Sequence, residues 1–197
     1  MRMLCIGGFL GSGKTTLLLR AARHLAAASQ TVAVIENEIG EIGVDGQIVS
    51  DLGMPVRELF GGCVCCTLQA GLVEALREIE ATMSPDWVIV EPTGLASPGD
   101  LVDAVHAWAP VVTDIHILTL VDAVRFSVLK EMAEPLIEAQ IKAAEVVAVN
   151  KIDQVDTAVV DAVVHDVAAL NPSATTLAIS ATQDGDLGKL FEGLLAP

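Results

Sequence analysis

The stretch GFLGSGKTT, residues 8–16, decides the fold of this 197-residue chain. A run rich in β-forming residues (2–7) precedes it, and a segment with Leu and Ala at helical spacing follows it, so the stretch joins a strand to a helix. Its pattern, GxxxxGKT, is that of a phosphate-binding loop, in which glycines let backbone amides curl around phosphate oxygens at the positive end of a helix. We therefore expect the loop to bind a nucleotide.

Individual residues of the loop have expected roles. Lys14 is expected to reach the β- and γ-phosphates, which makes it a catalytic candidate, and the Thr15 hydroxyl is expected to ligate magnesium. Further contacts to the nucleotide are expected from Gly8, Gly11, Ser12, Gly13 and Thr16. Phe9 and Leu10 stand where partition-type ATPases usually have an extra lysine, so the loop does not fit that branch.

The rest of the chain alternates between strands and helices. Nearly continuous apolar runs rich in Val and Ile, typical of strands buried on both faces, occupy residues 2–7, 31–37, 87–92, 114–123, 145–150 and 175–180. Between most of them lie segments of helical spacing, long enough for the crossovers that parallel strands require. This order predicts a three-layer α/β domain of the P-loop NTPase type, with a mostly parallel central sheet flanked by helices. We expect residues 1–197 to form this one domain.

Composition excludes several classes of partner. The net charge of −15 disfavours general binding to nucleic acid or to anionic membranes, and the 3% aromatic content without Tyr disfavours base stacking on single strands. The chain has no run of about 18 apolar residues, so the sequence predicts no membrane-spanning helix. The N-terminus lacks the pattern of a secretory signal. We expect a soluble cytoplasmic protein with reduced thiols.

The segment NKID, residues 150–153, indicates which base is bound. Guanine presents two adjacent donors, N1–H and the exocyclic amine, and the Asp153 carboxylate is suited to accept both. The stem of Lys151 is expected to lie on the base, and Asn150 to tie this segment to the phosphate loop. Ser180 and Ala181, at the end of the last predicted strand, are candidates to donate backbone hydrogen bonds to guanine O6.

Carboxylates at strand ends are candidates for hydrolysis. Glu91 ends one strand, where it would hold magnesium directly or through water, and the Gly94 amide three residues later would sense the γ-phosphate. Glu38 is the candidate for positioning water or magnesium, in an acidic stretch that also contains Glu36, Glu41 and Asp45. Asp122 ends another strand and is a further candidate site residue.

Three of the four cysteines lie in GGCVCC, residues 61–66. A disulfide between such near neighbours would be strained, and no histidine is assignable as a catalytic partner. On an extended backbone Cys63 and Cys65 would point the same way, and at a helix start Cys66 would favour the thiolate. Three thiolates suit zinc, or cobalt(II) as its mimic, and leave a fourth position open. A cysteine-rich turn without an ion is the plainer alternative.

Together, GFLGSGKTT, ENEIGEIGVDG, GGCVCC, EPTG and NKID resemble, in this order, the GTPase domain of CobW-type metallochaperones, relatives of the nickel-insertion GTPases for urease and hydrogenase. The resemblance implies a GTPase, using GTP/GDP and magnesium, that delivers zinc or cobalt(II) to a client metalloprotein or cobalamin-related enzyme. We expect its intrinsic turnover to be slow, because no motif makes an internal arginine finger of Arg20, Arg23, Arg57, Arg77 or Arg125. The resemblance also implies cargo metal on Cys63, Cys65 and Cys66, and a nucleotide- or metal-dependent homodimer fits this class. The nickel relatives typically have Cys-Pro-His where this chain has Cys-Val-Cys-Cys, which disfavours nickel.

The resemblance has a departure and leaves alternatives open. Longer members continue into a C-terminal domain and often have a histidine-rich stretch, and we expect neither in this chain. One alternative function is a GTP-dependent clamp that assembles a cobalamin enzyme or metalloenzyme, with the cysteines holding structural zinc. The other is a small-molecule kinase, which NKID and the lack of an arginine-rich lid disfavour.

Overall fold

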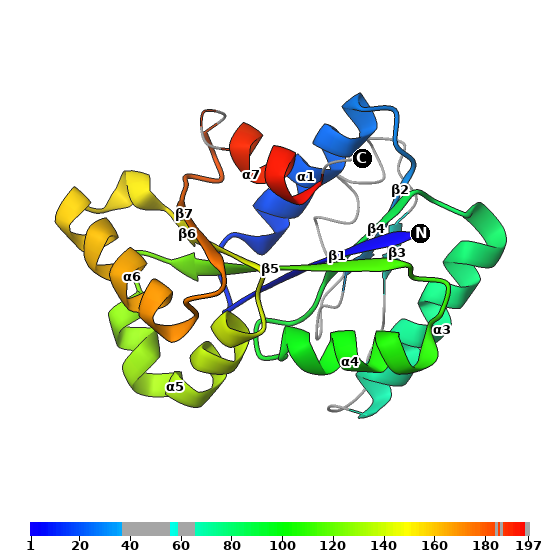
Figure 1. The fold of residues 1–197 in the computed structure, drawn as a ribbon, viewed down its shortest axis with the longest axis horizontal. Coiled ribbons are helices and arrows are strands. Elements are labelled where there is room, and N and C mark those ends of the chain that lie inside the picture. The colour runs from blue at the N-terminus through cyan, green and yellow to red at the C-terminus, as the bar shows by residue number, and fades with distance from the viewer. Residues whose placement is uncertain (37–55, 59–65, 184, 186, 196–197) are drawn as a thin grey trace.

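A computed structural model describes residues 1–36, 56–58, 66–183, 185 and 187–195 of the chain. Strands and helices alternate along it as the sequence predicts (Figure 1). The strands are β1 (Arg2–Gly8), β2 (Val32–Glu36), β3 (Val56–Glu58), β4 (Trp87–Glu91), β5 (Asp114–Asp122), β6 (Val146–Asn150) and β7 (Thr175–Ala178). The helices are α1 (Lys14–Ala27), α3 (Cys66–Met83), α4 (Pro98–Trp108), α5 (Phe126–Lys142), α6 (Thr157–Leu170), α7 (Leu187–Leu194) and the 3-10 turn η1 (Ile152–Gln154).

The strands form one seven-stranded sheet in the order β3-β2-β4-β1-β5-β6-β7. Every recorded pairing is parallel, from β2 with β3 at one edge to β6 with β7 at the other. The predicted three-layer α/β fold is therefore confirmed. The sequence analysis missed β3, because its three residues are too few to show a periodic pattern.

Helices cover both faces of the sheet, which explains why β1 has apolar residues at successive positions after Arg2. Met3 and Cys5 face a core shared with α3, α4, α5 and α6, whereas Leu4 and Ile6 face a second core shared with α1 and α7. Figure 1 shows these two groups of helices on opposite sides of the strands. A strand buried on both faces needs apolar residues at successive positions, which is the run that the sequence displays.

The helical faces expected from residue spacing are largely buried. On α1, Leu18, Ala22 and Leu25 are buried together, as the spacing predicts. On α3, Leu72, Leu76 and Ile79 are buried at the same spacing, and Met83, the last residue of the helix, is 40% exposed. None of the helices within the described residues is long and apolar enough to cross a membrane.

The parallel arrangement brings several loops to one edge of the sheet. β1 and β4 are adjacent, as are β1 and β5, and β5 and β6, so their carboxyl ends follow one another along that edge. The phosphate loop, Glu91, Asp122 and Asn150 are therefore neighbours in space although they are far apart in the chain.

Candidate functional site

The phosphate loop lies between β1 and the first turn of α1, where the sequence predicted it. Lys14 begins the helix and its side chain is only 7% exposed, with Nζ 3.8 Å from Glu91 Oε1. The adjacent Thr15 hydroxyl donates a 3.2 Å hydrogen bond to the same oxygen. A hydroxyl and a carboxylate oxygen at a helix N-terminus are ligands suited to a hard cation such as magnesium. The residues present therefore fit the expected magnesium-triphosphate group.

Two further features of the loop suit a phosphate group. Gly13 has a φ of +101°, and a Cβ there would lie 2.5 Å from Asn150 Nδ2, so only glycine allows this close approach. Ser12 is buried, and its Oγ has no hydrogen-bond partner among the described residues. A buried hydroxyl without a partner is costly, and a phosphate oxygen would satisfy it.

Gly94 packs directly against the phosphate loop. A Cβ at this position would lie 2.5 Å from the Leu10 backbone nitrogen, so the turn after β4 and the loop are in close backbone contact. The Gln140 side chain, buried in α5, holds the turn by donating to Gly94 O at 3.1 Å and Ala96 O at 2.9 Å. A change in the phosphate loop would thus reach this turn directly.

Asn150 connects three loops at the edge of the sheet. Its Nδ2 donates to Ser12 O at 2.8 Å, which is the tie between NKID and the phosphate loop that the sequence analysis expected. Its Oδ1 accepts a 2.8 Å hydrogen bond from the backbone N–H of Ala181, one of the two candidate donors to guanine O6; that candidate role stays a prediction. In this structure the Ala181 amide thus organises the loops, while the neighbouring Ser180 hydroxyl pairs with Thr182 Oγ1 at 3.0 Å.

The rest of the NKID segment forms a tight turn. Lys151 has a φ of +66°, an unfavourable conformation for a residue with a side chain and one that concentrates at functional sites. Its Nζ donates to Gly11 O at 2.6 Å, so Lys151 also contacts the phosphate loop. Asp153 lies exposed in η1, accessible to a ligand. The roles of these residues toward guanine stay predictions.

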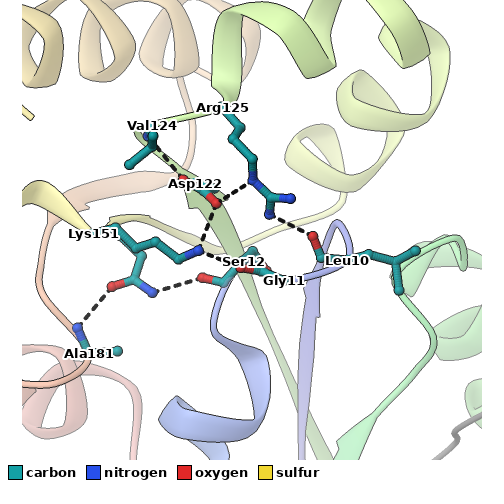
Figure 2. A network of polar contacts seen from close by, with 9 residues as sticks. Leu10, Gly11, Ser12, Asp122, Val124, Arg125, Lys151 and Ala181 are labelled. Atoms are coloured by element: carbon teal, nitrogen blue, oxygen red, sulfur yellow. Dashed lines mark hydrogen bonds and ion pairs between the residues drawn. The ribbon is translucent and has the colours of Figure 1, made fainter. Parts of the chain in front are cut away.

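Asp122 joins a cluster of charged residues above the phosphate loop (Figure 2). Its buried carboxylate accepts hydrogen bonds from Arg125 Nε at 2.7 Å and Lys151 Nζ at 2.9 Å. Burial alone would raise the pKa of Asp122, but these hydrogen bonds and the two positive charges outweigh it and hold the pKa below its ordinary value. Asp122 therefore stays ionised at neutral pH.

Several predicted site residues lie outside the described residues. They are Cys63, Cys65, Glu38, Glu41 and Asp45. Cys66 is the first residue of α3, at the helix start that we expected. Within the described residues, no group of three or more His, Cys, Asp or Glu side chains is arranged to hold a metal ion. The metal-binding role of GGCVCC stays a prediction.

The fourth cysteine, Cys5, lies in the core. It is fully buried in β1, and burial raises the pKa of its thiol to about 12. A thiol in this environment is neither a nucleophile nor a metal ligand.

Residues 2–178 match the family described as "CobW/HypB/UreG, nucleotide-binding domain". The chain belongs to the CobW/HypB/UreG family. The resemblance drawn from the sequence motifs is thereby confirmed, and this family member has its phosphate loop, Glu91 and Asn150 at one edge of the sheet.

Curated relatives of this family member are named as zinc chaperones. The zinc chaperone YeiR of Escherichia coli is 35% identical over 155 residues, covering 76% of this chain and 46% of the relative. The zinc chaperone CobW of Pseudomonas aeruginosa is 32% identical over 208 residues, covering 87% and 54%. The "Zinc-regulated GTPase metalloprotein activator 1" of Schizosaccharomyces pombe is 25% identical over 197 residues, covering 94% and 47%. The chain thus spans about half the length of these relatives.

Solved structures support the same fold. The hydrogenase maturation factor HypB of Archaeoglobus fulgidus superposes with a TM-score of 0.72 at 16% identity, covering 98% of this chain and 88% of that one. The Zn(II)-bound YjiA GTPase of E. coli superposes with a TM-score of 0.68 at 23% identity, covering 97% and 61%. At these identities the likeness concerns the fold alone.

Sequence reasoning missed two residues that shape the site. Arg125 belongs to no motif, and its position three residues after Asp122 at a strand end was the available signal. Gln140 gave only a weak signal, as a polar residue within an otherwise amphipathic helical segment. Its contact with the turn at Gly94 depends on tertiary packing.

Proposed function

We propose that this chain is the nucleotide-binding part of a metal carrier that binds and hydrolyses GTP and delivers zinc to a client protein. The observation on which the proposal rests is the convergence of Lys14, Thr15 and Glu91 at a loop that Asn150 joins to the predicted guanine-binding segment. The names of the zinc-chaperone relatives support zinc as the cargo. Cobalt(II) is the alternative cargo predicted from the thiolate set.

The chain's own residues support a division of labour in hydrolysis. Lys14 would neutralise charge on the phosphates, since its ammonium group is nearly buried at the helix N-terminus. Magnesium, when bound, would supply positive charge that stabilises the transferring phosphoryl group. Thr15 and Glu91 are the residues that would hold it. Gly94, in close contact with Leu10, would relay the state of the γ-phosphate to the turn before α4.

The sheet topology supports a link between nucleotide and metal. β3 runs parallel to β2 and ends at Glu58, and α3 begins at Cys66, so the predicted metal segment GGCVCC follows β3 in the sequence and ends in the first residue of α3. Its starting point is the sheet edge from which the phosphate loop also emerges. A coupling typical of allosteric proteins would change metal affinity by about 5- to 150-fold between the GDP and GTP states.

The test is a cobalt(II) titration followed by thiolate-to-cobalt absorption, in the presence of Mg·GDP and of a non-hydrolysable Mg·GTP analogue. We expect different affinities in the two states and loss of the band in Cys65→Ser. The matched control is Cys5→Ala, which removes a thiol from the core and should leave the band unchanged. Phosphate release from GTP, measured separately, tests hydrolysis.

Two other results would redirect the proposal. A strong band of equal affinity in both nucleotide states would favour a GTP-dependent assembly clamp with structural zinc. Absence of any band, with GTP hydrolysis intact, would remove the metal-carrier function and leave a GTPase. The proposal also includes a client metalloprotein or cobalamin-related enzyme, a nucleotide- or metal-dependent homodimer and a cytoplasmic location.

A further inference from the structure

Three consecutive carbonyl groups of the phosphate loop accept hydrogen bonds from side chains outside it. Arg125 Nη2 donates to Leu10 O at 2.7 Å, Lys151 Nζ to Gly11 O at 2.6 Å, and Asn150 Nδ2 to Ser12 O at 2.8 Å (Figure 2). The NKID motif accounts for Asn150 and Lys151. Arg125 and Asp122 belong to none of the motifs. Yet Arg125 and Lys151 both donate to the Asp122 carboxylate.

The Asp122 carboxylate sets the positions of both cations. Its Oδ2 accepts from Arg125 Nε and from Lys151 Nζ, so each cation bridges this one oxygen to a loop carbonyl. The carboxylate is itself fixed, because its Oδ1 accepts a 3.0 Å hydrogen bond from the Val124 backbone N–H. Charge-assisted bonds of this kind are stronger and more directional than neutral ones.

Holding these carbonyls outward determines where the loop amides point. In a trans peptide the C=O of one residue and the N–H of the next point in opposite directions. With Leu10 O held by Arg125, the Gly11 N–H therefore points to the opposite side of the loop. With Gly11 O held by Lys151, the Ser12 N–H turns back to Phe9 O at 3.1 Å and closes the turn. The closed turn thus fixes the direction of the Gly11 N–H, and a fixed backbone N–H is the kind of donor that a phosphate-binding loop offers to phosphate oxygens.

We propose that Asp122 and Arg125 are positioning residues for nucleotide binding, acting through the phosphate loop and Lys151 rather than on the nucleotide itself. This inference rests on the proposed GTP binding. Two cations and one anion also give the cluster a net positive charge beside the phosphate site, in a chain whose net charge is −15. That charge favours an anionic ligand at this edge.

Arg125 is the better residue to alter first. Its side chain is 43% exposed, whereas that of Asp122 is 1% exposed, so truncating Arg125 leaves no core cavity and the fold is expected to persist. The matched control is Arg77, which likewise donates from Nη2 to a backbone carbonyl, Trp108 O, at 2.6 Å, but on the α3–α4 side of the protein.

The experiment measures the Kd and dissociation rate of a fluorescent GDP analogue on the full chain by stopped flow. Arg125→Ala is expected to weaken binding about tenfold or more, mainly through faster dissociation, since it removes charge-assisted hydrogen bonds. Arg125→Lys should recover only part of the loss, because an ammonium group lacks the fork that reaches Asp122 and Leu10 together. Arg77→Ala should match the wild type.

A double-mutant cycle separates positioning from general stability. Lys151→Met keeps an apolar stem without the charge, and Asp122→Asn should then cost much less affinity in the Lys151→Met background than in the wild type. Additive effects would overturn the inference for Asp122. Arg125→Ala with unchanged affinity, or with reduced GTP turnover alone, would overturn it for Arg125. A wild-type chain that does not bind GDP would instead overturn the proposed function.

Discussion

The Thr15 hydroxyl donates a 3.2 Å hydrogen bond to Glu91 Oε1, across 76 residues of sequence and from the first turn of α1 to the end of β4. The contact exists because β1 and β4 are adjacent parallel strands, with Cys5 paired to Val90. It places one hydroxyl and one carboxylate where a cation between protein and triphosphate would be held.

Replacing Glu91 by Gln tests this pair. Glu91→Gln keeps the shape and removes the charge, and we expect magnesium-dependent GTP turnover to fall about 10- to 100-fold, as for residues that orient a metal. Phosphate release at several magnesium concentrations measures the effect. Glu138→Gln, which removes the charge of a partly exposed glutamate paired with Lys142 on α5, is the control. Equal turnover in Glu91→Gln and wild type would contradict the assignment.

Asp153→Asn tests guanine recognition. A carboxylate accepts from both guanine donors, whereas an amide offers one acceptor and one donor group. We expect GDP affinity to fall at least about tenfold, because a hydrogen bond to a charged group contributes ~1.5–3 kcal/mol. Competition binding with GDP, XDP and ADP measures it, and the preference should shift toward xanthine, which has a carbonyl in place of the amine. The neighbouring exposed Asp156, changed to Asn, should leave base preference unaltered.

Gln140→Leu tests how the turn at Gly94 is held. The substitution removes both donors to the carbonyls of Gly94 and Ala96, and an unsatisfied buried polar group costs ~1–3 kcal/mol. We expect the free energy of unfolding, measured by urea denaturation, to fall by about that amount. Gln69→Leu, at a solvent-accessible amide that donates to Asp100 O at 3.1 Å, should change it little. A similar loss in both variants would argue against a special role for Gln140.

Two glycine substitutions should have opposite effects. In Gly94→Ala the new methyl group would meet the Leu10 backbone at 2.5 Å, and forcing atoms into a packed site costs ~1–3 kcal/mol of stability. In Gly71→Ala the methyl group meets nothing within 4 Å in α3, and Ala is favoured over Gly in a helix by roughly 0.5–1 kcal/mol. Thermal unfolding of the two variants compares them directly. Stabilisation by Gly94→Ala would mean that the turn can move away from the phosphate loop.

The lowered pKa of Asp122 predicts a pH dependence. A carboxyl whose pKa is lower in the folded state stabilises the protein above its unfolded value, near 3.8, and this contribution is lost as the pH falls through the folded value. The wild type should therefore exceed Asp122→Asn in unfolding free energy by the largest amount at pH 7, and this difference should shrink below about pH 4. Urea unfolding across this range measures it. A difference that widens in acid would reverse the assigned sign.

The sequence by itself determined the class of fold and the main parts of the site. Buried parallel strands need apolar residues on both faces, and helices need a 3.6-residue period, so the two patterns were separable along the chain. The phosphate loop and the NKID segment could be predicted because the residues of each motif are close together in the sequence, such as the glycines before Lys14 and Asp153 after Asn150. Those motifs also supported the family that residues 2–178 match.

Only the tertiary structure decided which distant residues share contacts. Arg125 and Asp122 have no motif, yet the order of β1, β5 and β6 places them over Leu10 and beside Lys151. The Ala181 amide, a candidate donor to guanine O6, donates to Asn150 Oδ1, a contact that no motif indicates. Hydrogen bonds depend on positions to within a few tenths of an ångström, and those positions result from the packing of the whole sheet. Local sequence patterns do not encode them.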